Sequence, residues 1–331
     1  MNDAIVKPDI PLKLLLYDLL KCRKKLTSSE ANDYIIFSRG FVGECIFERI
    51  LCEEKMKNIL PLYSLLLNNR ASECQIDALL ITSKMIHLIE VKHFSGNYLI
   101  QDGKFISLQT KKEIKHPLAQ SERTTFLFKK ILEHLGIQMT IKNYVVFTNS
   151  EFMLYNAPVD LSLIFPGQIK QFLHRINANA EPITDKHEKI ATILKSQHKE
   201  KSRYERRPEY TMEELETGIF CWKCDGELGR ESRQYVICRT CQSTTHIKTA
   251  LLYSIAEFHL LFPDKKITVK RIFEWCGGIF SWKYIRRVLG KHLTRVPKGK
   301  HTYFFYPDKI EYLQLLKNTL REKLLKDLRN N

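Results

Sequence analysis

The sequence predicts a mixed α/β core followed by two smaller modules. Over residues 35–150, segments with helical periodicity alternate with short apolar runs typical of strands. Two Cys-x-x-Cys pairs follow within residues 218–249, and the excess of Lys and Arg is concentrated in residues 250–331. The length of 331 residues also fits two or three domains better than one. We therefore expect a multidomain protein.

The composition indicates a globular protein with an anionic partner. Hydrophobic residues make up 44% and charged residues 27%, which excludes disordered, collagen-like and disulfide-scaffold classes. The formal net charge is +16, and residues 250–331 alone hold 17 Lys and Arg against 7 Asp and Glu. Such a charge favours nucleic acid or an acidic membrane face as the partner.

The start of the chain predicts a cytoplasmic protein with no membrane span. Residues 1–7 lack the basic and apolar regions of a secretory signal. The apolar run at residues 14–20 is interrupted by Tyr17 and Asp18 and is far shorter than the roughly 20 residues that cross a bilayer. Of nine cysteines, four occur as two close pairs, a spacing of metal ligands rather than of disulfides.

The N-terminal part of the core is expected to be helical, and the next part to form hairpins. Apolar residues recur at three- and four-residue steps over residues 14–67, which places Glu44 on a helix. Residues 76–81 and 86–91 are apolar runs joined by a turn at 82–85. A second hairpin is expected around Asp102-Gly103, a dipeptide that favours a type I′ turn.

A helix and a strand complete the predicted core. Pro117 suits the first position of a helix that runs to Leu135, and Gly136 suits its end. Residues 144–147 then have the character of a buried strand.

The first hairpin is expected to bring two acids together. In a strand, Glu90 and Lys92 point to one face and Val91 points to the other, into the core. If the turn has two or four residues centred between positions 83 and 84, Asp77 lies opposite Glu90. A three-residue turn would place the two acids on opposite faces.

Opposed carboxylates predict a divalent cation. Mg²⁺, or Mn²⁺, prefers oxygen ligands, which Asp77, Glu90 and the carbonyl of Val91 could supply. Lys92 would then stabilise phosphate charge or help position a water nucleophile. The alternative is an ordinary ion pair between Glu90 and Lys92, with Asp77 as a surface acid.

Four short motifs in this region together resemble a known family. They are R-G-F-V-G-E at residues 39–44, Q-I-D at 75–77, I-E-V-K at 89–92 and H-P-L-A-Q at 116–120. In this order they are similar to the NERD domain, the nuclease-related branch of the PD-(D/E)XK superfamily. The resemblance implies a mixed-sheet, restriction-endonuclease-like fold and a phosphodiesterase site.

The resemblance also implies a role for each residue. Asp77 and Glu90 would be metal ligands, Lys92 the catalytic lysine, Glu44 an auxiliary acid and Gln120 a polar neighbour on the following helix. His116 stands where the family usually has Asn, and Cys74-Gln75 replaces the more usual acidic approach to Asp77. We expect His87, His93 and His116 to be structural or solvated.

The two Cys-x-x-Cys pairs predict a structural zinc ribbon. Four thiolates in two knuckles form the closed tetrahedral site that Zn²⁺ favours, with no position for substrate. The ligands would be Cys221, Cys224, Cys238 and Cys241. Two glycines and the apolar segment 235–237 between the pairs suit a β-hairpin. Before this module, residues 185–217 form a charged linker or a polar helix exposed to water.

The C-terminal module is similar to a winged helix. Helices are expected over residues 250–261, 268–275 and 282–289, with caps at Thr268 and Ser281, followed by a basic hairpin over 294–305. The third helix would enter a major groove of DNA while the hairpin meets phosphates. The expected contacts are Lys283, Arg286, Arg287, Lys298 and Lys300. The alternative is a helical packing module with a solvated basic face.

The leading hypothesis is therefore a magnesium-dependent deoxyribonuclease. The alternatives are a non-catalytic DNA-binding regulator, or sensor of DNA state, that uses a nuclease-like domain for binding, and an RNA-processing protein, since sequence does not reveal contacts to 2′-hydroxyls. A homodimer or a protein partner stays open. The expected domains are a helical extension (1–34), the NERD domain (35–184), the charged linker or helix (185–217), the zinc ribbon (218–249) and the winged-helix-like module (250–331).

Overall fold

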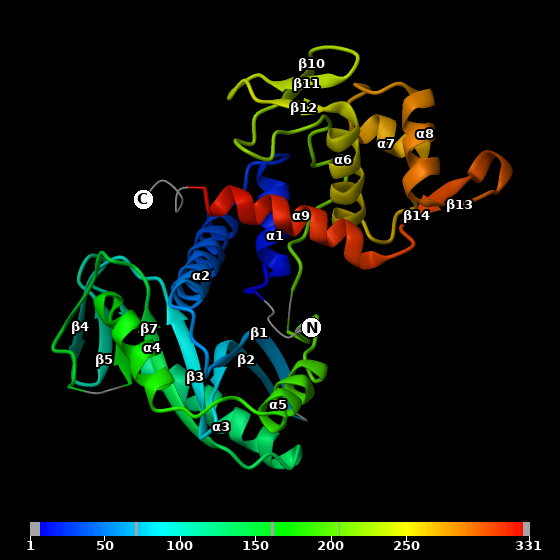
Figure 1. The fold of residues 1–331 in the computed structure, drawn as a ribbon. Coiled ribbons are helices and arrows are strands. Elements are labelled where there is room, and N and C mark those ends of the chain that lie inside the picture. The colour runs from blue at the N-terminus through cyan, green and yellow to red at the C-terminus, as the bar shows by residue number, and fades with distance from the viewer. Residues whose placement is uncertain (1–6, 70–71, 160–161, 205, 327–331) are drawn as a thin grey trace. The chain divides into compact units, whose positions relative to one another are not determined.

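The computed structural model describes residues 7–69, 72–159, 162–204 and 206–326, and it divides into two compact units (Figure 1). The first unit consists of residues 1–9 and 38–205, and the second of residues 10–37 and 206–331. Helix α2 (Ser28–Glu53) runs through the boundary at residue 38, so both units contain part of it.

The first unit contains two sheets, and the larger of them is mixed. Its strand order is β1-β2-β3-β7-β9, in which β1, β2 and β3 are antiparallel neighbours while β7 runs parallel to both β3 and β9. This confirms the predicted mixed α/β class. The strands are β1 (Leu60–Asn69), β2 (Ser72–Ile81), β3 (Met85–Lys92), β7 (Thr140–Phe147) and β9 (Leu163–Ile164).

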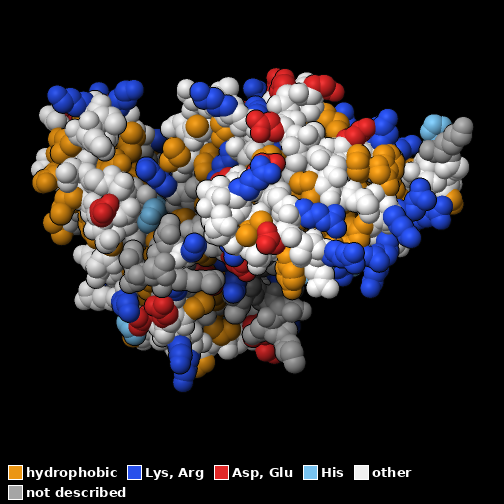
Figure 2. All heavy atoms as spheres, turned by 90° about the horizontal axis from the view of Figure 1, so that it is seen from above, with side chains coloured by type: hydrophobic (Ala, Val, Ile, Leu, Met, Phe, Trp, Pro, Cys, Tyr) orange, Lys and Arg blue, Asp and Glu red, His pale blue; other side chains and the backbone are white. Residues whose placement is uncertain are grey.

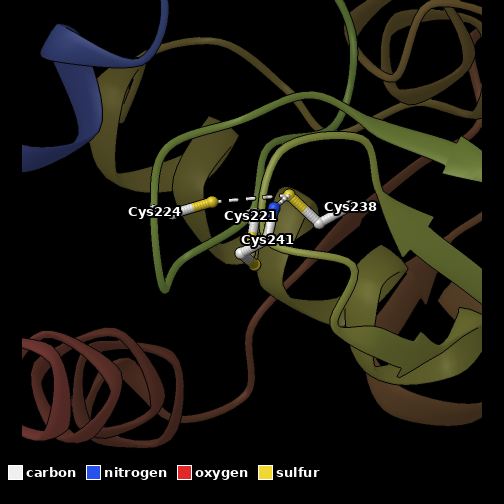
Figure 3. Close-up of side chains that lie close together, drawn as sticks. All are labelled: Cys221, Cys224, Cys238 and Cys241. Carbon is white, nitrogen blue, oxygen red and sulfur yellow. Dashed lines mark hydrogen bonds between the residues drawn. The ribbon is translucent and has the colours of Figure 1, made fainter.

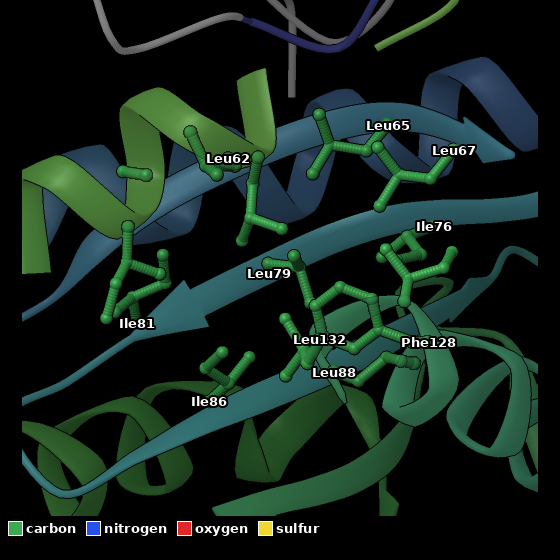
Figure 4. Packing of buried hydrophobic residues seen from close by; sticks show 14 of the residues in the cluster. Leu62, Leu65, Leu67, Ile76, Leu79, Ile81, Ile86, Leu88, Phe128 and Leu132 are labelled. Carbon is green, nitrogen blue, oxygen red and sulfur yellow. The ribbon is translucent and has the colours of Figure 1, made fainter. Parts of the chain in front are cut away.

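Helices cover both faces of this sheet. Alternate residues of β2 and β3 point to opposite faces, as the two-residue period of a strand requires. Leu79 and Leu88 pack with Phe128 of α3 (Pro117–His134) on one face (Figure 4). On the other face, Val91 packs with Phe172 of α4 (Ile169–Ala178), and residues of α2 join them.

Residues 185–217 were expected to be exposed to water, but helix α5 (Asp185–Ser196) within them buries one face. Ile190, Ala191 and Leu194 are buried in the same cluster as Phe128. These apolar residues lie three and four positions apart and form one stripe of the helix, which packs on β1. The many charged residues around this narrow stripe made the segment appear wholly polar.

The smaller sheet of the first unit carries the second predicted hairpin. Asp102 and Gly103 have φ values of +51° and +73°, as a type I′ turn requires, so this prediction is confirmed. Aromatic rings fill the core beneath the sheet, with Phe147 and Phe152 stacked at 3.9 Å between centroids. The strands are β4 (Gly96–Gln101), β5 (Lys104–Ser107), β6 (Glu113–Ile114) and β8 (Phe152–Tyr155), and the short 3-10 helix η1 (Pro166–Gln168) leads into α4.

The prediction of helix up to residue 67 is wrong, because residues 60–69 form the edge strand β1. Leu62, Leu65 and Leu67 are buried against the helices α3 and α5. A short run of leucines cannot be assigned to helix or strand by periodicity alone. Nine of these ten residues pair with β2, the next strand in the chain.

The second unit begins with α1 (Leu12–Lys21) and ends with α9 (Lys309–Leu324). Its caps lie where they were predicted: Thr268 Oγ1 accepts from Arg271 N at 3.2 Å, and Ser281 Oγ accepts from Tyr284 N at 3.3 Å. The remaining elements are β10 (Leu228–Arg230), β11 (Tyr235–Cys238), β12 (Thr244–His246), α6 (Ile247–Leu261), α7 (Val269–Trp275), α8 (Trp282–His292), β13 (Thr294–Val296), η2 (Gly299–His301) and β14 (Tyr303–Phe305).

A buried ion pair ties the start of this unit to its helical core. The guanidinium of Arg23 is fully buried and donates to both oxygens of Glu257 on α6, at 2.8 and 2.6 Å. It also donates to the carbonyls of Glu216 and Gly218 and stacks 3.6 Å from the ring of Trp275. These contacts pair the buried charge and join the start of the unit to α6 and to residues 216–218.

Among the described residues, no helix is long and apolar enough to cross a membrane.

Candidate functional site

The register of the first hairpin is the one that brings Asp77 and Glu90 together. The paired residues of β2 and β3 run from Ile81 opposite Ile86 to Ala78 opposite Ile89. The next position along this register places Asp77 opposite Glu90. Four residues, 82–85, separate the paired Ile81 and Ile86, so the even count that places the two acids on one face is met.

Both ladders of β2 are interrupted at Asp77. On the β1 side, Tyr63 pairs with Ala78 and Leu65 with Ile76, while Ser64 between them has a φ of +47° and no ladder partner. On the β3 side, the pairing ends one residue before Asp77. The Asp77 side chain fills this gap, because its Oδ2 accepts a hydrogen bond from the backbone N–H of Val91 at 2.8 Å. The strands therefore diverge at the row that holds the acids.

Glu90, Lys92 and Gln120 form one hydrogen-bonded group. Glu90 is 3% exposed, and its Oε1 accepts from Lys92 Nζ and from Gln120 Nε2, both at 2.5 Å. Lys92 Nζ lies 3.4 Å from Gln120 Oε1. Gln120 reaches the strand because α3 begins next to it, with His116 Nδ1 accepting from Leu118 N at 3.3 Å. His116 thus caps the helix, a structural role as expected.

Glu44 approaches the same row from α2. Its Oε2 accepts from the hydroxyl of Ser64 at 3.1 Å, and Ser64 is the residue that breaks the β1 ladder opposite Asp77. The helix comes this close because the preceding residue is Gly43. A Cβ there would lie 2.7 Å from His93 Cβ and 3.0 Å from Thr148 Oγ1. The φ of Gly43 is not left-handed, so the backbone conformation does not call for glycine. The close contact with His93 and Thr148 does.

Burial and neighbouring carboxylates disfavour the charged forms of Asp77 and Glu44. Burial raises the pKa of Asp77 to about 7, and the Glu90 carboxylate adds to this effect, while Lys92 and the Val91 N–H oppose it. Burial and then Asp77 raise the pKa of Glu44 well above its usual range, against the hydrogen bond from Ser64. A divalent cation bound at this row would favour the charged carboxylates and lower both pKa values.

A comparison with models of protein families identifies the domain to which this part of the chain is similar. The model of the nuclease-related domain matches residues 39–148. The chain contains a NERD domain. The matched segment begins on α2, ends directly after β7 and includes the row of acids and Gln120.

Two further comparisons add little detail. A crystal structure of protein VC1899 from Vibrio cholerae is similar at 13% sequence identity, with a TM-score of 0.25 over 50% of this chain and 50% of that protein. The chain thus spans about half the length of that protein. No curated protein matches the chain.

Two polar residues of the NERD domain site lay outside the sequence analysis. Ser64 falls in the segment that was expected to be helical, so no signal pointed to it. Thr148 follows β7, and its backbone N–H donates to the carbonyl of Lys92 at 2.9 Å. Its hydroxyl lies 3.0 Å from His93 Nδ1. Thr148 holds the end of β3 in place, and only the parallel pairing of β3 with β7 brings it there.

The predicted zinc ligands converge in the second unit. The Sγ atoms of the four cysteines all lie within 4.8 Å of one another (Figure 3), and they form the only such ligand group among the described His, Cys, Asp and Glu residues. The closest pairs are Cys224 with Cys238 at 3.4 Å and Cys221 with Cys241 at 3.8 Å. Zinc–thiolate bonds of about 2.3 Å in a tetrahedron require sulfur separations of roughly 3.8 Å, so the cluster fits zinc.

The chain around the cysteines forms the two expected knuckles. Thr240 N and Cys241 N both point at the sulfur of Cys238, at 3.4 Å each, which suits a thiolate at that position. Gly226 lies against the other knuckle, and a Cβ there would be 2.3 Å from Thr240 Oγ1. The strands β10, β11 and β12 form a three-stranded sheet beside the cluster, one strand more than the predicted hairpin.

Four of the five expected DNA contacts are exposed, and one of them lines a groove. Lys283, Arg286 and Arg287 are all exposed on α8, and Lys298 is exposed in the loop between β13 and β14. Of these, only Arg286 lines the groove described below. The side chain of Lys300 lies outside the described residues.

Proposed function

We propose that the chain is a metal-dependent nuclease that hydrolyses phosphodiester bonds in DNA, with the reaction at the row of acids in the NERD domain. The observation that supports this most is the joint position of Asp77, Glu90 and Lys92 where the strands diverge. In an ordinary sheet, like charges at this spacing are destabilising. Their presence is explained by a cation and a phosphate that bind there.

Each residue then has a separate task. Asp77, Glu90 and the carbonyl of Val91 would hold Mg²⁺ or Mn²⁺, which would supply a Lewis acid for the phosphate and lower the pKa of water. Lys92 carries the positive charge that stabilises phosphate oxygens as charge develops on them. Glu44 adds negative charge from α2, and Gln120 holds Glu90 in place.

One oxygen of each acid already accepts hydrogen bonds. Glu90 Oε1 accepts from Lys92 and Gln120, and Asp77 Oδ2 accepts from Val91 N. The second oxygen of each carboxylate would therefore be the ligand for a cation, with these hydrogen bonds kept. The charge of the cation would weaken the attraction between Glu90 and Lys92, which would make the ammonium group of Lys92 more available to the phosphate.

The test is cleavage of supercoiled plasmid, linear duplex and single-stranded DNA by the full-length protein with Mg²⁺, Mn²⁺ or EDTA. Lys92→Ala and Asp77→Ala should abolish cleavage. Lys84→Ala is the matched control, because Lys84 lies at the turn of the same hairpin and is 59% exposed. Full-rate cleavage by both site variants would refute the proposal. DNA binding without cleavage under all conditions would instead favour the regulator that uses the NERD domain for binding.

A further inference from the structure

The second unit contains a groove that the nuclease site does not explain. It lies between α7, α8 and the hairpin β13-β14 and has a volume of about 1080 Å³. Five cations line it, and Glu274 is the only acid among the lining residues; the cations are Lys266, Lys270, Arg271, Arg286 and Arg295. We call it the basic groove. Figure 2 shows Lys and Arg side chains gathered over the part of the second unit that contains α8 and the hairpin.

Most of this charge is available to a ligand. Glu274 lies 3.8 Å from Lys270, an exposed pair of small energetic value. Arg286 and Arg295 are exposed and have no carboxylate within ion-pair distance in the described part of the chain. The groove therefore attracts an anion, and its volume lies at the upper end of the roughly 300–1,000 Å³ of ligand pockets. Its five cations against one acid fit a segment of a polyanion.

One stripe of α8 provides both an aromatic platform and open space. Trp282, Arg286 and Gly290 follow at steps of four, so they lie on one face of the helix, and all three line the groove. Trp282 is 45% exposed, and Phe273 supports its ring at 5.1 Å between centroids. Nothing lies within 4 Å of a Cβ built at Gly290, so its missing side chain leaves the groove floor clear.

From this geometry we infer that the basic groove binds a single strand of nucleic acid, with its phosphates on Arg286 and Arg295 and a base stacked on Trp282. Cations beside an exposed aromatic ring are the combination by which proteins hold single strands, because every base has a face that can stack. A paired base inside a duplex offers no such face. The inference extends the proposed function by naming how substrate is held, and it is tested without cleavage.

The experiment measures binding of the full-length protein to fluorescein-labelled 12-mers of single-stranded DNA, the same sequence as RNA, and duplex DNA, all in EDTA. We expect the single strands to bind more tightly than the duplex and to quench tryptophan fluorescence. Of the three tryptophans, Trp275 is fully buried and Trp222 is partly buried, so the quenching that Trp282→Phe abolishes reports on Trp282. Trp282→Phe should abolish most of the quenching and keep most of the affinity, while Trp282→Ala should weaken binding roughly 10-fold.

Two further variants separate the groove from the general surface charge. Arg286→Ala should weaken single-strand binding and reduce the slope of log affinity against log salt by about 0.7 for one lost phosphate contact. Lys283→Ala is its control, since Lys283 is on the same helix and outside the groove. Gly290→Leu removes no charge and should still block binding, with its unfolding temperature not lowered because the site has room and leucine favours helix.

The outcomes distinguish the alternatives. Equal effects of Lys283→Ala and Arg286→Ala would overturn the inference, as would full binding by Gly290→Leu. Tighter binding of the duplex without quenching would also overturn it, and would favour the outer face of α8 in a major groove. Equal affinity for DNA and RNA would support it, with contacts that do not involve the 2′-hydroxyl. Because the readout is binding in EDTA, failure of the nuclease assay leaves these results intact.

Discussion

Replacement of Gly43 by alanine tests whether α2 lies as close to the end of β3 as the structure shows. Alanine in a helix interior is favoured over glycine by about 0.8–1.0 kcal/mol. At this position, however, the added Cβ lies 2.7 Å from His93 Cβ and 3.0 Å from Thr148 Oγ1. Inserted atoms in a packed site cost about 1–3 kcal/mol. The net expectation for Gly43→Ala is therefore a loss of about 0–2 kcal/mol.

Gly40 on the same helix provides the matched control. It is exposed, and nothing lies within 4 Å of a Cβ built there. Gly40→Ala should therefore gain about 1 kcal/mol from helix propensity alone. Since this gain is common to both variants, the difference between them is the steric cost at Gly43, about 1–3 kcal/mol.

Hydrogen exchange followed by mass spectrometry is the suitable assay, because the chain has two units and its global unfolding need not be two-state. Peptides from α2 and β3 should lose protection in Gly43→Ala relative to Gly40→Ala, with exchange faster by roughly 5-fold or more. DNA cleavage should fall in parallel, because Glu44 is the next residue and shifts with the helix. Equal protection in the two variants would refute the close packing of α2 on this site.

Two other predictions concern charge and metal. In EDTA, Asp77 should destabilise the protein increasingly as the pH rises from about 4 to about 7, because its pKa is raised to about 7 and burial favours only the protonated form. Unfolding midpoints at pH 5 and pH 8 should show this dependence, and Asp77→Asn should reduce it. An unchanged dependence in the variant would contradict the assignment. The purified protein should also contain one zinc per chain by elemental analysis. Cys221→Ser should lose that zinc along with the protection of β10 and β11 from hydrogen exchange, because structural zinc stabilises its ribbon directly; full zinc content in this variant would contradict the four-cysteine site.

The hairpins and caps could be predicted from sequence because they depend on neighbours in the chain. Asp102-Gly103 specifies its turn through the φ values that the turn needs, and Thr268 specifies a helix start through one local hydrogen bond. The register of Asp77 and Glu90 followed from the length of a single turn. In each case the deciding contact spans fewer than about fifteen residues.

Two elements could not be predicted in the same way. The strand β1 pairs with the next strand in the chain, but the leucines that it buries would suit a helix equally well, so its pattern does not decide between the two. Helix α5 packs through three apolar residues onto that same strand, across more than 100 positions of sequence. The basic groove likewise separates Arg286 from Lys283, since α7 and the hairpin decide which face of α8 is enclosed.

The site in the NERD domain combines both kinds of information. The motifs place Asp77, Glu90 and Lys92 on adjacent strands. In a regular sheet, however, the backbone N–H and C=O groups of these residues would pair with the neighbouring strand. The left-handed residue Ser64 and the missing pair at Asp77 open the ladder on both sides of β2, so that a side chain instead of a carbonyl meets Val91 N. This irregularity costs backbone hydrogen bonds of the ladder at the row of acids. A sheet that loses pairing at the row of its acids is consistent with a site organised for an ion and a phosphate rather than for stability.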